Sequence, residues 1–154
     1  MRNRKSIWTG IVAALVALLL PAAAADAGTA HIRIGNTLVG QVLTNGAGYV
    51  LLMFPREENS LTVCIRIKSC MSDWPPVTTT GPPIAGRGVD RNLLGTEPYR
   101  GKLLEVTYAG WPLHTYRFAY SAQNSILNIG IRQFGDQWDA LDPAGGFVTG
   151  PQPL

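Results

Sequence analysis

A short segment that begins with glycine and an aromatic residue occurs twice, and it constrains the fold more than any other feature. Residues 48–54 read GYVLLMF, and residues 110–116, 62 positions later, read GWPLHTY. Each copy then reaches a tryptophan, Trp74 or Trp138, with a glycine beyond it. Two copies of a β unit each expose an apolar face that only the other copy covers. Chance similarity among Gly- and aromatic-rich strands is the alternative. The predicted repeats cover about residues 38–82 and 103–146.

Alternating apolar and polar residues predict β-strands along most of the chain. The clearest alternation covers residues 61–68, which places four apolar side chains on one face. Shorter strands are predicted at residues 31–34, 38–43, 49–54, 103–108, 113–120 and 137–141. No segment after residue 27 has a convincing helical period. We therefore expect an all-β fold of antiparallel strands in which the two repeats are related by a pseudo-twofold axis.

The stretch from Pro75 to Pro98 holds five prolines and four glycines. Such a composition is typical of loops, so we expect a long surface crossover between the repeats. Residues 28–154 are enough for one hydrophobic core, which predicts one compact domain.

Residues 1–27 read as a cleavable secretory signal peptide. A basic start precedes an apolar run over residues 7–20, which ends at Pro21 and is shorter than the roughly 18–20 residues of a spanning helix. The small residues before Gly28 fit a signal-peptidase site. We expect a secreted, periplasmic or cell-envelope protein with no stable membrane span after cleavage. An uncleaved N-terminal anchor is the alternative.

Charge argues against a nucleic-acid partner. The chain has 13 Lys and Arg against 10 Asp and Glu, but three of the basic residues and one acidic residue belong to the leader. The remainder carries about +1, which is too little to favour nucleic acid or an anionic membrane.

The two cysteines, Cys64 and Cys70, predict a disulfide, because an even pair in an exported chain is more often bonded than free. A redox-active pair or two soft metal ligands are the alternatives. The spacing is not C-x-x-C, and no histidine lies nearby to complete a zinc site.

Three motifs together resemble a known family. They are Cys70-x-x-x-Trp74-Pro75-Pro76, Tyr108-x-Gly110-Trp111-Pro112-Leu113 and Gln133-Phe134-Gly135-x-x-Trp138. This order is similar to that of bacterial secreted-repeat proteins, often lipoproteins, that carry a tyrosine-x-aromatic-x-x-aspartate motif and have no known function. The resemblance covers about residues 38–146 and implies a pseudo-twofold all-β domain.

The chain departs from that family at its acidic positions. Glu57 occupies the acid's place in the first copy, but Ala119 occupies it in the second, and His114 replaces the motif's tyrosine. Any site that the family builds from these acids is therefore in doubt in this chain.

No catalytic or metal-binding constellation is predicted. His114 is a lone histidine on an expected strand, where a half-buried structural role is favoured over a general base or a haem or metal ligand. Asp136, Asp139 and Asp142 do not form one oxygen-rich loop for calcium. Nucleophile-elbow, Walker and zinc-helix motifs do not occur. We expect no enzymatic activity, no cofactor and no metal.

The aromatic residues divide into core and surface candidates. Trp111 and Trp138 sit in the repeat framework and are expected to fill the core. Trp74, which precedes two prolines, is expected to be partly exposed. The candidate ligand surface consists of Trp74, Tyr49, His114 and Tyr116.

The sequence thus predicts an exported, non-catalytic binding or cell-envelope interaction module, most simply a monomer, with an unidentified envelope or extracellular ligand. The alternative is an extracytoplasmic redox or metal/haem accessory domain that uses His114, Met53, Met71 and the two cysteines.

Overall fold

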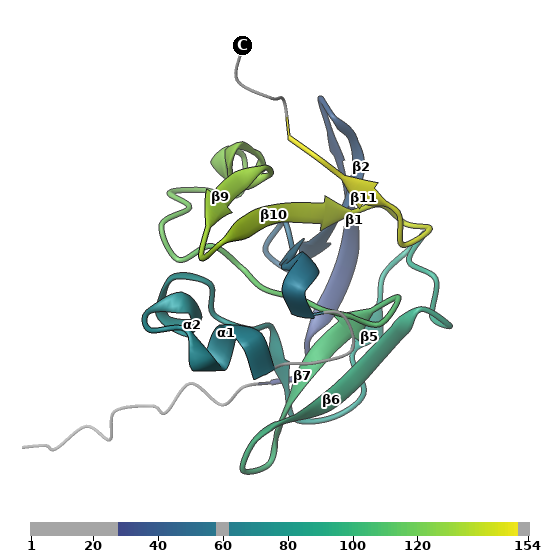
Figure 1. The fold of residues 1–154 in the computed structure, drawn as a ribbon. Helices are drawn as coiled ribbons and strands as arrows, with labels where there is room; N and C mark the ends of the chain where they lie inside the picture. The colour runs from purple at the N-terminus through teal and green to yellow at the C-terminus, as the bar shows by residue number, and fades with distance from the viewer. Residues whose placement is uncertain (1–27, 58–61, 151–154) are drawn as a thin grey trace, which may run out of the picture.

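The computed structural model describes residues 28–57 and 62–150 (Figure 1). Strands dominate, and they form three sheets with mostly antiparallel pairing, so the predicted all-β class is confirmed. The predicted signal peptide lies outside the described residues. Among the helices that the structure describes, none has the length and apolar character needed to cross a membrane.

The first sheet is built on a hairpin of β1 (His31–Thr37) and β2 (Gly40–Asn45). Gly40 has a φ of 112°, which a side chain disfavours, and it lies where the chain turns back into β2. β5 (Ile84–Ala85) pairs in parallel with the start of β1, which gives the strand order β2-β1-β5.

The second sheet is also built on a hairpin, formed by β6 (Leu94–Arg100) and β7 (Leu103–Tyr108). β4 (Thr78–Thr79) and β8 (Trp111–Pro112) also pair with β7. In Figure 1 the β6–β7 hairpin lies below the upright β1–β2 hairpin, and side chains of both hairpins pack in one apolar cluster.

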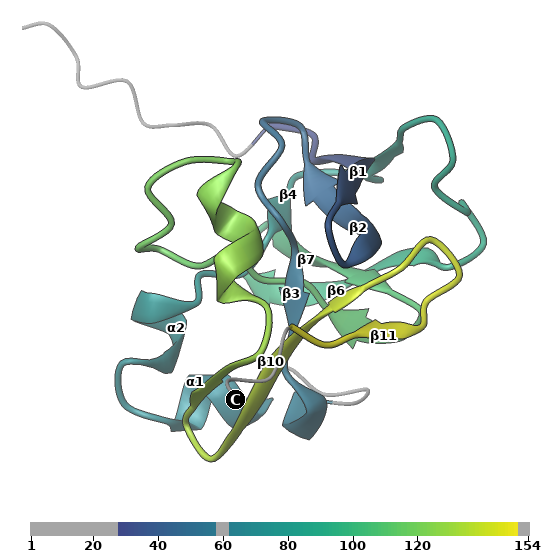
Figure 2. The ribbon, with the colours of Figure 1, turned by 90° about the horizontal axis from the view of Figure 1, so that it is seen from above.

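The third sheet joins β3 (Leu52–Met53) to the C-terminal strands. β10 (Asp136–Leu141) pairs with β3, with β9 (Ile131–Gln133) and with β11 (Phe147–Val148). The helical elements are short: η1 (Pro55–Glu57), α1 (Thr62–Arg66), α2 (Cys70–Asp73) and η2 (Asn124–Asn128). In Figure 2, η2 is the light green turn beside the blue chain that leads into β3.

Elements recur along the chain at a constant spacing. β1 and β6 are each seven residues long, β2 and β7 are each six, and both pairs start 63 positions apart. The hydrogen bond from Leu51 N to Leu43 O, at 2.9 Å, has a counterpart from Leu113 N to Val106 O, at 3.0 Å.

The two series of elements meet at Leu52 and His114, which occupy equivalent places 62 positions apart. Each donates its N–H to the other's carbonyl, at 2.9 and 2.8 Å, in an antiparallel bridge.

Residues 50–54 separate two apolar clusters. Val50, Leu52 and Phe54 belong to one cluster with Trp74 and Trp138, whereas Leu51 and Met53 belong to the other. Successive side chains of an extended segment point to opposite faces, so this segment is buried on both sides.

The strand predicted at residues 61–68 is wrong, because α1 forms there instead. The Cys64–Cys70 disulfide holds the two Cα atoms 5.3 Å apart. The chain must therefore reverse direction between these cysteines. A strand that continued to residue 68 would leave only residues 69 and 70 for this reversal, whereas a reverse turn takes four residues. The helical turn instead directs Val63 and Ile67 onto the core.

Three further strand and loop predictions need correction. Residues 49–54 form a strand only at Leu52–Met53, and residues 113–120 contain only the isolated bridges of His114. The Pro75–Pro98 segment is not a simple loop, because β4, β5 and the start of β6 lie within it. Short pairings with distant strands ordered these stretches, which local composition could not reveal.

Candidate functional site

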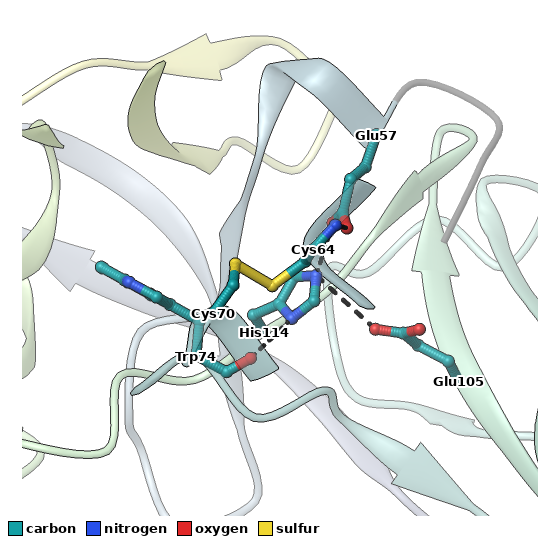
Figure 3. Close-up of polar contacts among 6 residues, drawn as sticks. All are labelled: Glu57, Cys64, Cys70, Trp74, Glu105 and His114. Carbon is teal, nitrogen blue, oxygen red and sulfur yellow. Dashed lines mark hydrogen bonds and ion pairs between the residues drawn. A yellow bond between two sulfur atoms is a disulfide. The ribbon is translucent and has the colours of Figure 1, made fainter. Parts of the chain in front are cut away.

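His114 lies fully buried at the centre of a polar cluster between the two apolar clusters (Figure 3). Its backbone bridges Leu52 on one side and Pro76 on the other. Its ring nitrogens are both engaged: Nδ1 lies 3.0 Å from the Trp74 carbonyl oxygen, and Nε2 lies 2.9 Å from Glu57 Oε2. Main chain and side chain together fix the position of this histidine.

Glu57 ends η1 and is fully buried. One carboxylate oxygen contacts His114, and the other, Oε1, accepts a hydrogen bond from Cys64 N at 2.8 Å. This second bond satisfies an N–H in the first turn of α1, where such groups lack helical partners. Glu57 therefore joins His114 to the disulfide-bearing helix α1.

Glu105, on β7, is the third member of the cluster. Its Oε1 lies 3.6 Å from His114 Nε2, and within the described part of the chain neither oxygen has a hydrogen-bond partner. Burial, followed by the nearby charges of Glu57 and Glu97, raises the pKa of Glu105 to about 9. Glu105 is therefore protonated at neutral pH.

Glu97 faces Glu105 directly across the β6–β7 pair. Its pKa is also raised, first by desolvation and then by Glu57, while the positive charge of His114 acts in the opposite direction. Like charges directly opposite on a sheet are destabilising. Two carboxyl groups, those of Glu57 and Glu105, thus lie beside one histidine, and the unpaired Glu105 stays neutral.

The cluster is closed to substrates. The side chains of Glu57, Glu105 and His114 have 0% exposure. Across residues 28–57 and 62–150, no group of three or more His, Cys, Asp and Glu is arranged to hold a metal ion. What the cluster does is connect η1, α1, β7 and the chain around Trp74 in one network of buried polar contacts.

Trp74 does not lie on the surface, so its predicted partial exposure is wrong. Its ring stacks on Trp138 with centroids 4.1 Å apart and planes 3° apart, and it contacts Tyr116 on another side. Its Nε1 donates to Gln133 Oε1 at 2.7 Å. Of the two prolines that follow it, Pro75 accepts a hydrogen bond from Thr115 N and Pro76 forms a bridge with His114. His114 is likewise buried and belongs to the framework.

The predicted disulfide between Cys64 and Cys70 is present, and both residues are fully buried. Of the two tryptophans expected in the core, Trp138 is fully buried, whereas Trp111 is half-buried and packs edge-on against Phe147. Met53 and Met71 pack in different apolar clusters. The structure therefore does not bring together the side chains named for a redox or metal site.

Tyr49 and Tyr116, the other two candidates for a ligand surface, do come together. They line a surface depression of about 310 Å³, called here the Tyr49 depression, with Asn45, Thr115, Arg117 and Ala119. Tyr116 and Ala119 also line a neighbouring hollow of about 270 Å³, the Tyr120 depression. Its other lining residues are Phe118, Tyr120, Asn124, Leu127 and Asn128. The two depressions adjoin at Tyr116.

Large apolar side chains around the Tyr120 depression are exposed. Tyr120 is 93% exposed, Leu127 is 74% exposed, and Phe118 is about half exposed. The predicted strand over residues 113–120 hid this feature, because alternation would have turned every second side chain inward. A reading of residues 117–127 as a turn-rich loop with scattered aromatic residues would have found it.

The segment that carries this surface is firmly attached. Thr115 N donates to Pro75 O at 3.0 Å, and Arg117 N donates to Asp73 O at 2.9 Å. On the η2 side, Ser125 Oγ accepts a hydrogen bond from Val50 N at 2.9 Å, which ties η2 to the segment between the two clusters. The buried network therefore holds the exposed residues in place.

A third and larger depression of about 740 Å³ lies on the other side of η2. It is lined by the β1–β2 turn and by Ala122, Gln123 and Ile126. η2 thus separates two hollows, one lined mainly by aromatic rings and one lined mainly by small and aliphatic residues.

Comparisons with family models, with curated proteins and with solved structures each found no match for this chain.

Proposed function

We propose that this chain is an exported, non-catalytic binding or cell-envelope interaction module that holds its ligand on residues 115–128. The observation that carries the proposal is the gathering of exposed Phe118, Tyr120 and Leu127 around adjoining depressions. Exposed apolar side chains that gather around a hollow mark interaction sites far more often than isolated ones do. Aromatic residues in particular are enriched where proteins bind partners.

The buried cluster supports a non-catalytic role. His114 and Glu57 are the best-placed pair for proton transfer, since 2.9 Å separates Nε2 from Oε2. A general base must reach a proton on the substrate, and both of these side chains are fully buried. The pair serves instead to support the adjoining surface segment, which begins at the very next residue.

Export rests on the leader and on the disulfide. A disulfide is stable in the oxidising conditions outside the cytoplasm, and the Cys64–Cys70 bond is compatible with them. We expect the mature protein to begin at Gly28. The intact mass of protein recovered from its native compartment tests this expectation, and a species that retains residues 1–20 would contradict it.

The recurring hairpins support two diverged copies of one unit. The matched copies begin earlier than the repeats read from the sequence, since β1 and β6 start at His31 and Leu94. In this arrangement the binding surface belongs to the second copy, because the equivalent region of the first copy is occupied by η1, α1 and the disulfide.

The proposal is tested by measuring the binding of cell-envelope fractions to immobilised protein. Separate polysaccharide, lipid and protein fractions are applied to the wild type, to Tyr120→Ala and to Ile84→Ala. Ile84 is a half-exposed apolar residue on β5, away from the proposed surface, and so provides the control. Tyr120→Ala should weaken binding to one fraction at least tenfold without changing the melting temperature. Equal binding by Tyr120→Ala and wild type in every fraction would refute the proposal.

A further inference from the structure

The two adjoining depressions have the same kind of lining. The Tyr49 depression combines the ring of Tyr49 with the amide of Asn45, and the Tyr120 depression combines the ring of Tyr120 with the amides of Asn124 and Asn128. Tyr116 contributes to both. Each depression thus combines aromatic rings with side-chain amides.

Rings and amides together suit sugars. The face of an aromatic ring is negative, so it attracts the C–H bonds that project from one side of a pyranose ring. An amide offers two N–H donors and a carbonyl acceptor, which match neighbouring hydroxyl groups. The depressions have volumes of about 270 and 310 Å³, one just below and one at the low end of the roughly 300–1,000 Å³ of small-molecule pockets, as expected for subsites that each hold one sugar residue.

Asn128 gives independent evidence for a ligand. Its side chain lines the Tyr120 depression and is only 7% exposed, and in the part of the chain that the structure describes, its Nδ2 has no hydrogen-bond partner. An unpaired buried donor costs free energy. An acceptor oxygen on a bound molecule, reached by a small rotation of the amide, would satisfy it.

Asn45 supplies a comparable group in the other depression. Its Oδ1 accepts hydrogen bonds from Ala47 N and Tyr49 N, both at 3.0 Å. These bonds orient the side chain and leave its NH₂ group as the donor for a ligand. Each depression therefore contains a side-chain amide that the protein constrains. Asn45 is oriented by hydrogen bonds, and Asn128 is buried.

Arg117 favours a ligand with a negative charge. Among the residues that the structure describes, it is the one charged residue that lines either depression. Its guanidinium carbon lies 5.3 Å from the centroid of the Phe118 ring, at the border between the depressions, and Nη1 donates to Ser72 Oγ at 2.9 Å. A guanidinium has five N–H donors, and its fork geometry matches a carboxylate.

We propose that the two depressions are adjoining subsites for an oligosaccharide that carries carboxylate groups, with Tyr116 between two sugar residues and Arg117 paired with one carboxylate. The inference rests on the proposed function and specifies its ligand.

The test uses the mature protein and immobilised tetramers of galacturonate, mannuronate, guluronate and the glucuronate-containing hyaluronan repeat, each beside its methyl ester. Esterification removes the charge and keeps the sugar. Wild type should bind at least one acid form about ten- to a hundredfold more tightly than its ester, as expected for a charge-assisted contact. Arg117→Gln should lose that preference, so that the acid form and its ester bind equally. The side-chain amide signals of Asn128 and Asn45 should shift on binding in NMR spectra.

Arg100→Gln is the matched control. Arg100 is also exposed and also lies over an aromatic ring, that of Tyr99, but on β6 and outside both depressions. The Arg100→Gln variant should bind the tetramers as the wild type does. Ester forms that bind as well as the acids would overturn the assignment of a carboxylate.

Two outcomes separate this inference from the proposed function. If wild type binds none of the tetramers but keeps Tyr120-dependent binding to an envelope protein or lipid fraction, the saccharide inference fails and the binding module stands. If no fraction shows Tyr120-dependent binding, both fail.

Discussion

Replacing Glu105 by glutamine should stabilise the protein, and increasingly so as the pH rises. The side chain is fully buried, its oxygens lack partners among the described residues, and its pKa is raised from 4.5 to about 9. The folded protein therefore keeps the proton at a pH where the unfolded chain has released it. Glutamine has the same shape and cannot ionise, so it removes this linkage.

The sign and size of this stability gain follow from the raised pKa of Glu105. Below about pH 4.5 both states are protonated and the full stability is present. Between pH 4.5 and about 9, wild-type stability falls by about 1.4 kcal/mol for each pH unit. Relative to wild type, Glu105→Gln should therefore gain about 3 kcal/mol at pH 7 and about 6 kcal/mol at pH 9, as upper limits.

Guanidinium denaturation of the disulfide-intact protein at pH 5, 7 and 9 measures this gain. Glu97→Gln serves as the comparison, because Glu97 is half-buried and should give a much smaller dependence on pH. A difference between Glu105→Gln and wild type that stays constant from pH 5 to pH 9 would show that Glu105 ionises normally in the folded state, and the reasoning would be refuted.

Three further perturbations test the framework. His114→Ala leaves the Glu57 carboxylate buried without its partner and should cost about 3–5 kcal/mol in chemical denaturation; a midpoint like that of wild type would contradict the network. Trp74→Ala should also cost about 3–5 kcal/mol, and half-buried Trp111→Ala distinctly less, so equal thermal melts would be evidence against the stacked core. The Cys64–Cys70 disulfide should resist alkylation until reduced, and its reduction should cost about 2–3 kcal/mol; uptake of alkylating groups by the native protein, measured by mass, would contradict this.

The hairpins could be predicted because their signals are local. Alternation at residues 31–34, 38–43 and 103–108 depends only on neighbouring side chains, and strands formed at each of these places. The helix α1 could not be predicted from the same signal. Its sequence alternates as well as any strand, and the short disulfide loop overrides that pattern.

Some residues of the site could be predicted from the sequence, but its geometry could not. His114, Tyr49 and Tyr116 could be singled out from the sequence, but the pairing of His114 with Glu57 joins residues 57 positions apart. Trp74 was misplaced because two following prolines usually signal an exposed edge. Here they follow a buried ring that stacks on Trp138, a contact that depends on how the two halves meet.

The pairing of Leu52 with His114 has a consequence for the order in which the chain folds. Residues 50–54 are covered on one side by β10 and on the other by the segment around His114. A chain that emerges N-terminus first, from a ribosome or a translocation channel, therefore presents an uncovered apolar segment until about residue 141 has followed. Contacts of such high sequence separation form slowly and leave sticky surface exposed meanwhile. Termination before the second hairpin should thus yield an aggregating fragment rather than a folded half.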